Sequence, residues 1–191
     1  MDSLPQNHAV SMHPGDADVL MGVKRITVAN LALSDSGRHF GMDETQWVEW
    51  FSEASLKTEV PEPVRRLFEV ARGAMIYGWY YYPLLALGSD ECIRCLEAGA
   101  RHAAWIAKLH AEPDKQVKVP FHTVIRSLVQ AGLIMATDAD QWEAGRILRN
   151  AAAHPTTPTL LLPGQARAML SVTGGKLDRL FSRVVALPSL G

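Results

Sequence analysis

Apolar residues recur at steps of three and four along most of the chain after residue 42, which is the spacing of amphipathic helices. This pattern predicts helices at residues 43–60, 63–82, 89–110, 123–131, 138–154 and 165–183, the fifth of which begins at either Asp138 or Asp140. Prolines and glycines separate these segments, as they commonly do between helices. We therefore expect an all-α protein, a helical bundle of about five to seven helices.

Residues with known capping preferences mark several of the expected helix ends. Asp43, followed three residues later by Gln46, predicts a capping box at the start of the first helix. Pro63 suits the first turn of the second helix, and Ser89 is the expected N-cap of the third. Gly132 suits the end of the fourth helix, because glycine readily adopts the left-handed conformation that ends a helix.

The same periodicity predicts which side of a helix faces the core. In the first helix the apolar side comprises Trp47, Trp50, Phe51 and Leu56. In the last helix we expect the arginines to face outward and the following residues to be buried: Ala168, Met169, Val172, Leu177, Leu180 and Phe181.

Residues 1–42 show no sustained helical period and carry scattered prolines and glycines. We expect them to form a less regular N-terminal arm. The remaining residues, 43–191, are expected to form a single helical domain, because a chain of 191 residues has the usual length for one domain.

The formal net charge of −1 argues against a protein that coats nucleic acid through bulk positive charge. The charge is nevertheless uneven. Residues 43–62 carry six acidic residues and one lysine, whereas residues 140–191 carry six basic and three acidic residues. The last quarter of the chain is therefore the part most suited to an anionic ligand.

Neither a secretory signal nor a membrane span is expected. The first residues lack the basic start and apolar core of a signal, so we expect a cytoplasmic location. The longest uncharged span, residues 73–89, is slightly short for a bilayer and contains Pro83.

Cys92 and Cys95 lie in a helical segment without a redox context, so we expect core thiols. No further ligands at metal-like spacing accompany them.

Residues with side chains suited to catalysis occur close together at 149–154, where the sequence reads RNAAAH and Pro155 follows. The guanidinium of Arg149 offers a planar fork of donors suited to a phosphate oxygen. The imidazole of His154 exchanges a proton near neutral pH. Together they supply an acid or base and a cation, which are two requirements of phosphodiester cleavage.

The spacing of this pair constrains how it can act. On a straight helix five residues turn by about 500°, so Arg149 and His154 would not share a face. Pro155 disfavours the α conformation at His154, so the helix is expected to end at or just before this residue, which lets its side chain turn back. Alternatively, the two side chains meet their counterparts across a two-fold axis, and a complete site exists only in a dimer.

The sequence RNAAAH at residues 149–154 resembles the signature of the HEPN superfamily, in which an arginine is followed by four to six residues and then a histidine. Asn150 matches the polar residue that commonly follows that arginine. Residues 77–85 and 92–98 are similar to the paired central helices of HEPN-like bacterial domains of unknown function. The resemblance covers residues 63–183.

The resemblance implies a small helical bundle that is often a homodimer. Many HEPN proteins are endoribonucleases that need no metal or other cofactor and act as toxins or in phage defence, whereas others only bind. It therefore implies RNA as the nucleic acid, not DNA, and a protein partner such as an antitoxin. No membrane partner is implied.

Within this interpretation, His154 handles a proton of the ribose hydroxyl, Arg149 binds the scissile phosphate, and Asn150 positions one or the other. The expected substrate-binding residues are Arg146, Glu97 and Tyr82.

Each assignment has a structural alternative. Arg149 can pair with an acid while His154 caps a helix end. Arg146 can form a surface ion pair with Glu143, and Glu97 can pair with Arg94 or Arg101 instead of orienting the motif. Most aromatic residues at 79–82 are expected in the core, with one tyrosine hydroxyl reaching the cleft. The alternative function is a non-catalytic helical module that binds RNA, a nucleotide or a protein partner.

Overall fold

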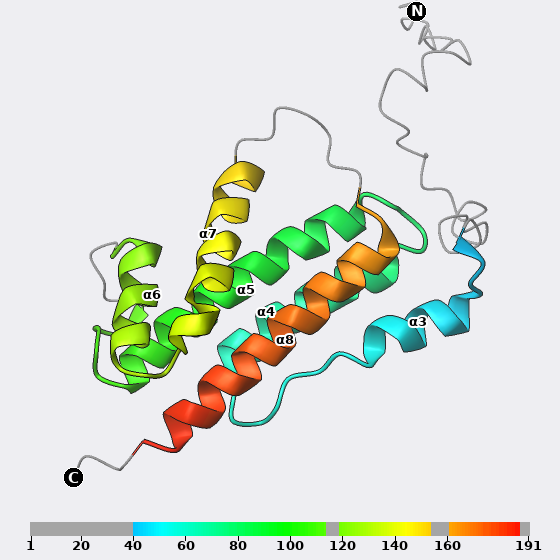
Figure 1. Ribbon diagram of the computed structural model, residues 1–191. Helices are drawn as coiled ribbons and strands as arrows, with labels where there is room; N and C mark the ends of the chain where they lie inside the picture. Colours follow the sequence, from blue (N-terminus) through cyan, green and yellow to red (C-terminus); the bar gives the residue numbers. More distant parts are fainter. Residues whose placement is uncertain (1–39, 114–118, 154–160, 188–191) are drawn as a thin grey trace, which may run out of the picture. The chain divides into compact units, whose positions relative to one another are not determined.

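The computed structural model describes residues 40–113, 119–153 and 161–187, and for residues 146 and 148–153 it describes the main chain alone (Figure 1). These residues form six α-helices and one short 3-10 helix: α3 (Glu44–Ser52), α4 (Glu62–Tyr77), α5 (Leu84–Ile106), α6 (Phe121–Gln130), η3 (Ala136–Asp138), α7 (Ala139–Ala153) and α8 (Pro163–Val185). The predicted all-α class is confirmed. Except for residues 40–42, the predicted N-terminal arm lies outside the described residues.

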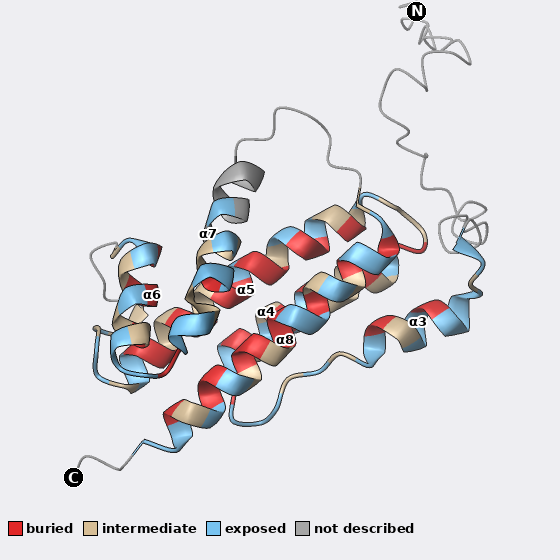
Figure 2. Ribbon diagram, viewed as in Figure 1, coloured by how far each residue is buried: buried red, intermediate tan, exposed pale blue. Residues whose placement is uncertain are grey.

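Helix α5 is the centre of the described fold, because α4, α6, α7 and α8 all pack against it. Figure 1 shows α8 running alongside α4 and α5. Buried positions follow α5 and α8 along most of their length (Figure 2). Large side chains fully excluded from solvent include Phe68, Met75, Leu85, Leu170 and Leu177. The predicted core thiols are confirmed, since Cys92 and Cys95 are buried and free.

The predicted capping box at the start of α3 is confirmed. The carboxylate of Asp43 accepts a hydrogen bond from the main-chain nitrogen of Gln46 at 2.8 Å, and the Gln46 side chain accepts one from the nitrogen of Asp43 at 3.0 Å. The helix ends at Ser52, earlier than predicted, so Leu56 lies in the connection to α4. A tertiary contact holds that connection, because the main-chain nitrogen of Lys57 donates to the Asp178 carboxylate of α8 at 2.9 Å.

The predicted N-cap role of Ser89 is wrong. Helix α5 begins at Leu84, and Ser89 lies inside it, buried, with its hydroxyl donating to the carbonyl of Leu85 at 3.0 Å. Serine makes this bond to a carbonyl one turn earlier when no water is available to it. The apolar turn before Ser89 is helical because it packs against α4. The local sequence pattern does not predict this tertiary contact.

The buried stripe of α8 is rotated from the predicted one. Leu177, Leu180 and Phe181 are buried as expected, but Ala168 is exposed and 49% of the surface of Val172 is exposed. The helix instead buries Ala166, Leu170, Thr173 and Lys176. Lys176 is buried because the start of α7 covers it, where its ammonium meets the Gln141 carbonyl and the Trp142 ring. Hydropathy alone does not predict that placement.

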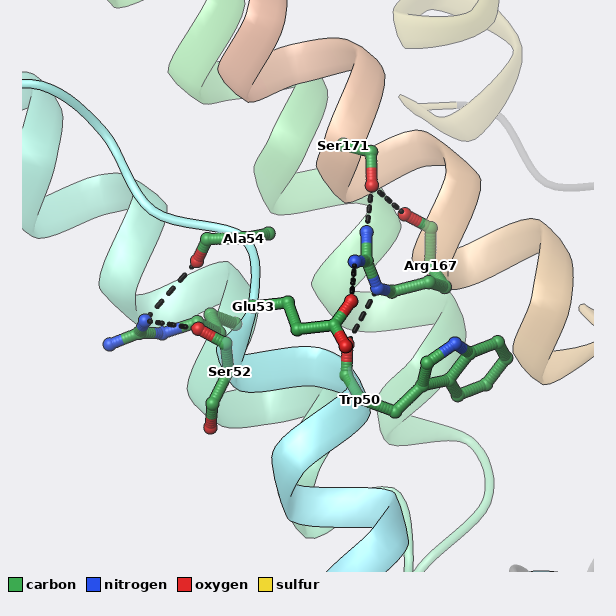
Figure 3. A network of polar contacts seen from close by, with 7 residues as sticks. Trp50, Ser52, Glu53, Ala54, Arg167 and Ser171 are labelled. Atoms are coloured by element: carbon green, nitrogen blue, oxygen red, sulfur yellow. Dashed lines mark hydrogen bonds and ion pairs between the residues drawn. The ribbon is translucent and has the colours of Figure 1, made fainter.

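A polar network joins the end of α3 to α8 and α4 (Figure 3). The guanidinium of Arg167 donates to the Trp50 carbonyl at 2.6 Å, to the Glu53 carboxylate at 2.7 Å and also to the Ser171 hydroxyl. Arg72 of α4 donates to the Ala54 carbonyl at 3.2 Å. These cations satisfy carbonyls at and beyond the end of a helix, where such groups lack helical partners. Arg167 therefore faces a neighbouring helix and not outward as predicted.

The close packing of α4 and α5 predicts that Gly88→Ala destabilises the protein. A methyl group at Gly88 would lie 2.8 Å from the main-chain oxygen of Ala71 and 2.7 Å from a side-chain carbon of Met75. We expect a loss of about 1–3 kcal/mol in the free energy of unfolding, measured by urea denaturation. Gly73→Ala is the matched control, because no atom lies within 4 Å of a methyl group there. It should stabilise by about 0.5–1 kcal/mol. Equal effects of the two substitutions would contradict this packing.

Candidate functional site

Helix α7 carries the predicted motif at its C-terminal end. Trp142, 4% exposed, anchors the start of the helix in the core, and Gly145 faces Leu96 of α5, 3.8 Å from the position of a methyl group. The main chain of Arg149 and Asn150 lies in the last turns of α7, which continues to Ala153. Within the described residues the helix thus reaches Ala153, and the predicted helix end at His154 lies outside them.

Most of the motif lies outside the part of the molecule whose side chains are described. This applies to the side chains of Arg146, Arg149 and Asn150 and to the whole of His154. Their catalytic and substrate-binding roles stay predictions.

Glu97 lies on α5, the helix that packs against α7. Its carboxylate pairs with Arg101 at 2.6 Å, which is one of the alternatives expected from sequence. Arg101 also donates to the carbonyl of Val119 at 3.0 Å, so this ion pair fixes the chain just before α6. Arg94 instead lies 3.8 Å from Glu91. This ion pair does not test whether Glu97 binds substrate, so that role stays a prediction.

Tyr82 lies close to the segment that follows the motif. Its hydroxyl donates to the carbonyl of Leu161 at 2.5 Å, and its ring stacks on Phe40 with 6.3 Å between ring centroids. Burial raises the pKa of this phenol above its ordinary value. Tyr82 therefore anchors the chain seven residues after His154 as a neutral donor. Binding of substrate by Tyr82 stays a prediction.

Neither cysteine is suited to nucleophilic chemistry. Burial raises the pKa of Cys92 to about 12 and that of Cys95 further, so both stay protonated thiols at neutral pH. Among the described residues, no group of three histidine, cysteine, aspartate or glutamate side chains is placed to hold a metal ion. In the same part of the chain, no helix is both long enough and apolar enough to cross a bilayer.

Sequence reasoning missed a second feature, which we call the basic hollow. It lies where α8 meets η3 and the start of α7, and its lining comprises Leu133, Ile134, Asp138, Trp142, Lys176, Arg179, Leu180 and Arg183. The three cations are spaced three and four residues apart on α8, which places them on one face of the helix. This spacing is visible in the sequence and could have indicated a cluster of positive charge on one side of the last helix.

Two of the three cations of the basic hollow donate to main-chain oxygens. The ammonium of Lys176, only 6% exposed, donates to the carbonyl of Gln141 at 2.8 Å and lies 5.7 Å from the ring centroid of Trp142. Arg183 donates to the carbonyl of Leu133 at 3.1 Å. Burial, followed by the charge of Arg179, lowers the pKa of Lys176 from its ordinary value of 10.5.

Comparisons of this chain with known proteins give no support for a family. No family model, curated protein or solved structure matches it.

The structure thus separates two regions along α7. The predicted catalytic motif occupies the C-terminal end of the helix, and the basic hollow lies at its start. Since Asp138 and Arg149 are eleven residues apart, the two regions are about 16 Å apart along the helix axis.

Proposed function

We propose that this protein is an RNA-directed helical protein of the HEPN kind and that residues 149–154 form a metal-independent endoribonuclease site. One observation carries the proposal: α7 brings Arg149 and Asn150 to its last turns and continues to Ala153, directly before His154. Residues 149–153 of the motif therefore lie in the last described turns of α7, the helix that precedes α8 in this all-helical fold.

In the proposed reaction, the ribose 2′ oxygen attacks the adjacent phosphorus and the bond to the 5′ oxygen breaks. His154 accepts the proton of the 2′ hydroxyl, and the departing 5′ oxygen takes up a proton from water. Arg149 stabilises the negative charge that develops on the phosphorus oxygens. Asn150 positions one of these groups. The product is a 2′,3′-cyclic phosphate, and no redox partner or metal takes part.

The biological setting that fits this activity is a toxin or a phage-defence protein of the cytoplasm. Such a protein acts on cellular RNA and is controlled by a partner such as an antitoxin. A homodimer that brings two copies of the motif into one cleft is the proposed assembly.

The proposal predicts that the purified protein cleaves total RNA in the presence of a chelator and leaves cyclic phosphate ends. Electrophoresis and analysis of the end groups measure both. A parallel preparation of His154→Ala controls for contaminating ribonucleases. Failure of the folded protein to cleave any RNA, combined with measurable RNA binding, would favour the non-catalytic module instead. Cleavage that requires a divalent metal would contradict the mechanism.

A further inference from the structure

The basic hollow presents positive charge that no acidic residue neutralises directly. Lys176, Arg179 and Arg183 line it together with a single carboxylate, Asp138, which leaves the lining with a formal charge of +2. In the described part of the chain, no ion pair within 4.0 Å joins these cations to an acid. Their hydrogen bonds to carbonyls of Gln141 and Leu133 orient the charges without cancelling them.

Holding these cations together carries an electrostatic cost. Lys176 is almost fully buried, and burial and Arg179 disfavour its charged form more than the nearby carboxylate of Asp138 favours it. An anion placed among the three cations would offset the repulsion and would itself accept charge-assisted hydrogen bonds, which are the stronger kind. The arrangement therefore favours a ligand with concentrated negative charge.

The dimensions of the basic hollow limit how much of an anionic ligand can enter it. Its interior has room for about one water molecule, so a single oxygen atom can enter while the rest of the ligand stays at the mouth. Leu133 and Ile134 form apolar walls that offer no further side-chain donors. Arg179, which is exposed, is free to reach a group at the mouth.

We infer that the basic hollow binds one phosphate group, which in this protein is a phosphodiester of the RNA strand at a distance from the scissile bond. The assignment to RNA rests on the proposed function. Because α7 connects the basic hollow to the motif over about 16 Å, a strand several nucleotides long spans both. Contacts of this kind position a nucleic acid without reading its sequence.

Arg179→Gln tests the inference, because an exposed side chain can be changed without disturbing the core. Binding of a fluorescent single-stranded RNA is measured by anisotropy at several salt concentrations, with His154→Ala as the background so that cleavage does not interfere. We expect Arg179→Gln to weaken binding about tenfold at low salt. The slope of log K against log salt should fall by about 0.7. Arg66→Gln is the matched control, because Arg66 is an exposed arginine of α4.

A second arm distinguishes the source of the phosphate. Inorganic phosphate is added at constant ionic strength, and the midpoint of thermal unfolding is compared with that in chloride. We expect phosphate to raise the midpoint of the parent protein but not that of Arg179→Gln. A phosphate effect without any effect on RNA binding assigns the site to a free phosphate compound. Identical behaviour of Arg179→Gln and Arg66→Gln in both arms would overturn the inference, whether or not the protein cleaves RNA.

Discussion

Replacing His154 with alanine is expected to lower the rate of RNA cleavage by about 10²–10⁴-fold, the usual contribution of a positioned acid or base. The reason is that the attacking 2′ hydroxyl loses the group that removes its proton. The rate is measured on a defined RNA in the presence of a chelator. His122→Ala, a change at an exposed histidine of α6, is the matched control and should leave the rate unchanged. Circular dichroism establishes that both variants are folded.

Arg149 allows a further test of the same site. Arg149→Lys keeps the charge but removes the planar fork of donors, so it should retain more activity than Arg149→Ala and less than the parent protein. Full activity of His154→Ala would refute the assignment of this residue as the acid or base. Equal activity of both Arg149 variants and the parent would refute a role for Arg149 at the phosphate.

Mixed dimers distinguish a site within one chain from a site shared by two. If Arg149 of one chain acts with His154 of its partner, chains carrying Arg149→Ala and His154→Ala complement each other. Random pairing of coexpressed chains then restores about a quarter of the parent activity, because half of the dimers are mixed and each has one intact site. A site contained within one chain would give no recovery.

Replacing Trp47 with alanine is expected to cost about 3–5 kcal/mol of unfolding free energy, the largest stability effect we predict. Trp47 is fully buried, and its indole nitrogen donates to the carbonyl of Ile76 at 3.0 Å and to that of Met75 at 3.2 Å. Its ring also packs against Phe51 and Trp79. Helix α3 has only nine residues, too few to be stable by itself, so it depends on this anchor.

Two further variants keep the Trp47 prediction testable if the alanine variant fails to fold. Trp47→Phe retains most of the packing but removes the indole donor to the Met75 and Ile76 carbonyls, which keep main-chain donors at the end of α4. This change should cost about 0.5–1.5 kcal/mol. Val48→Ala is the matched control on the same helix, because Val48 is 38% exposed, and should change stability by less than about 0.5 kcal/mol. Urea denaturation followed by circular dichroism gives all three values. A Trp47→Ala variant as stable as Val48→Ala would contradict the packing of α3 on α4.

The sequence by itself determined the features that depend on a few neighbouring residues. Helix periodicity predicted the all-α class and each α-helix of the described residues, although not the short 3-10 helix η3, because a repeat of 3.6 residues is a local property. The capping box of Asp43 and Gln46 was predicted for the same reason, since both partners belong to one turn.

The tertiary structure alone decided which side of each helix is covered and where helices begin against a neighbour. Ser89 lies inside α5 and Lys176 is buried in α8 because other helices cover those positions, which no local pattern encodes. Tyr82 meets Leu161, and the basic hollow forms, only when segments distant in sequence are packed together. Burial of a polar side chain is set by the partners that satisfy it, and those partners are supplied by the fold.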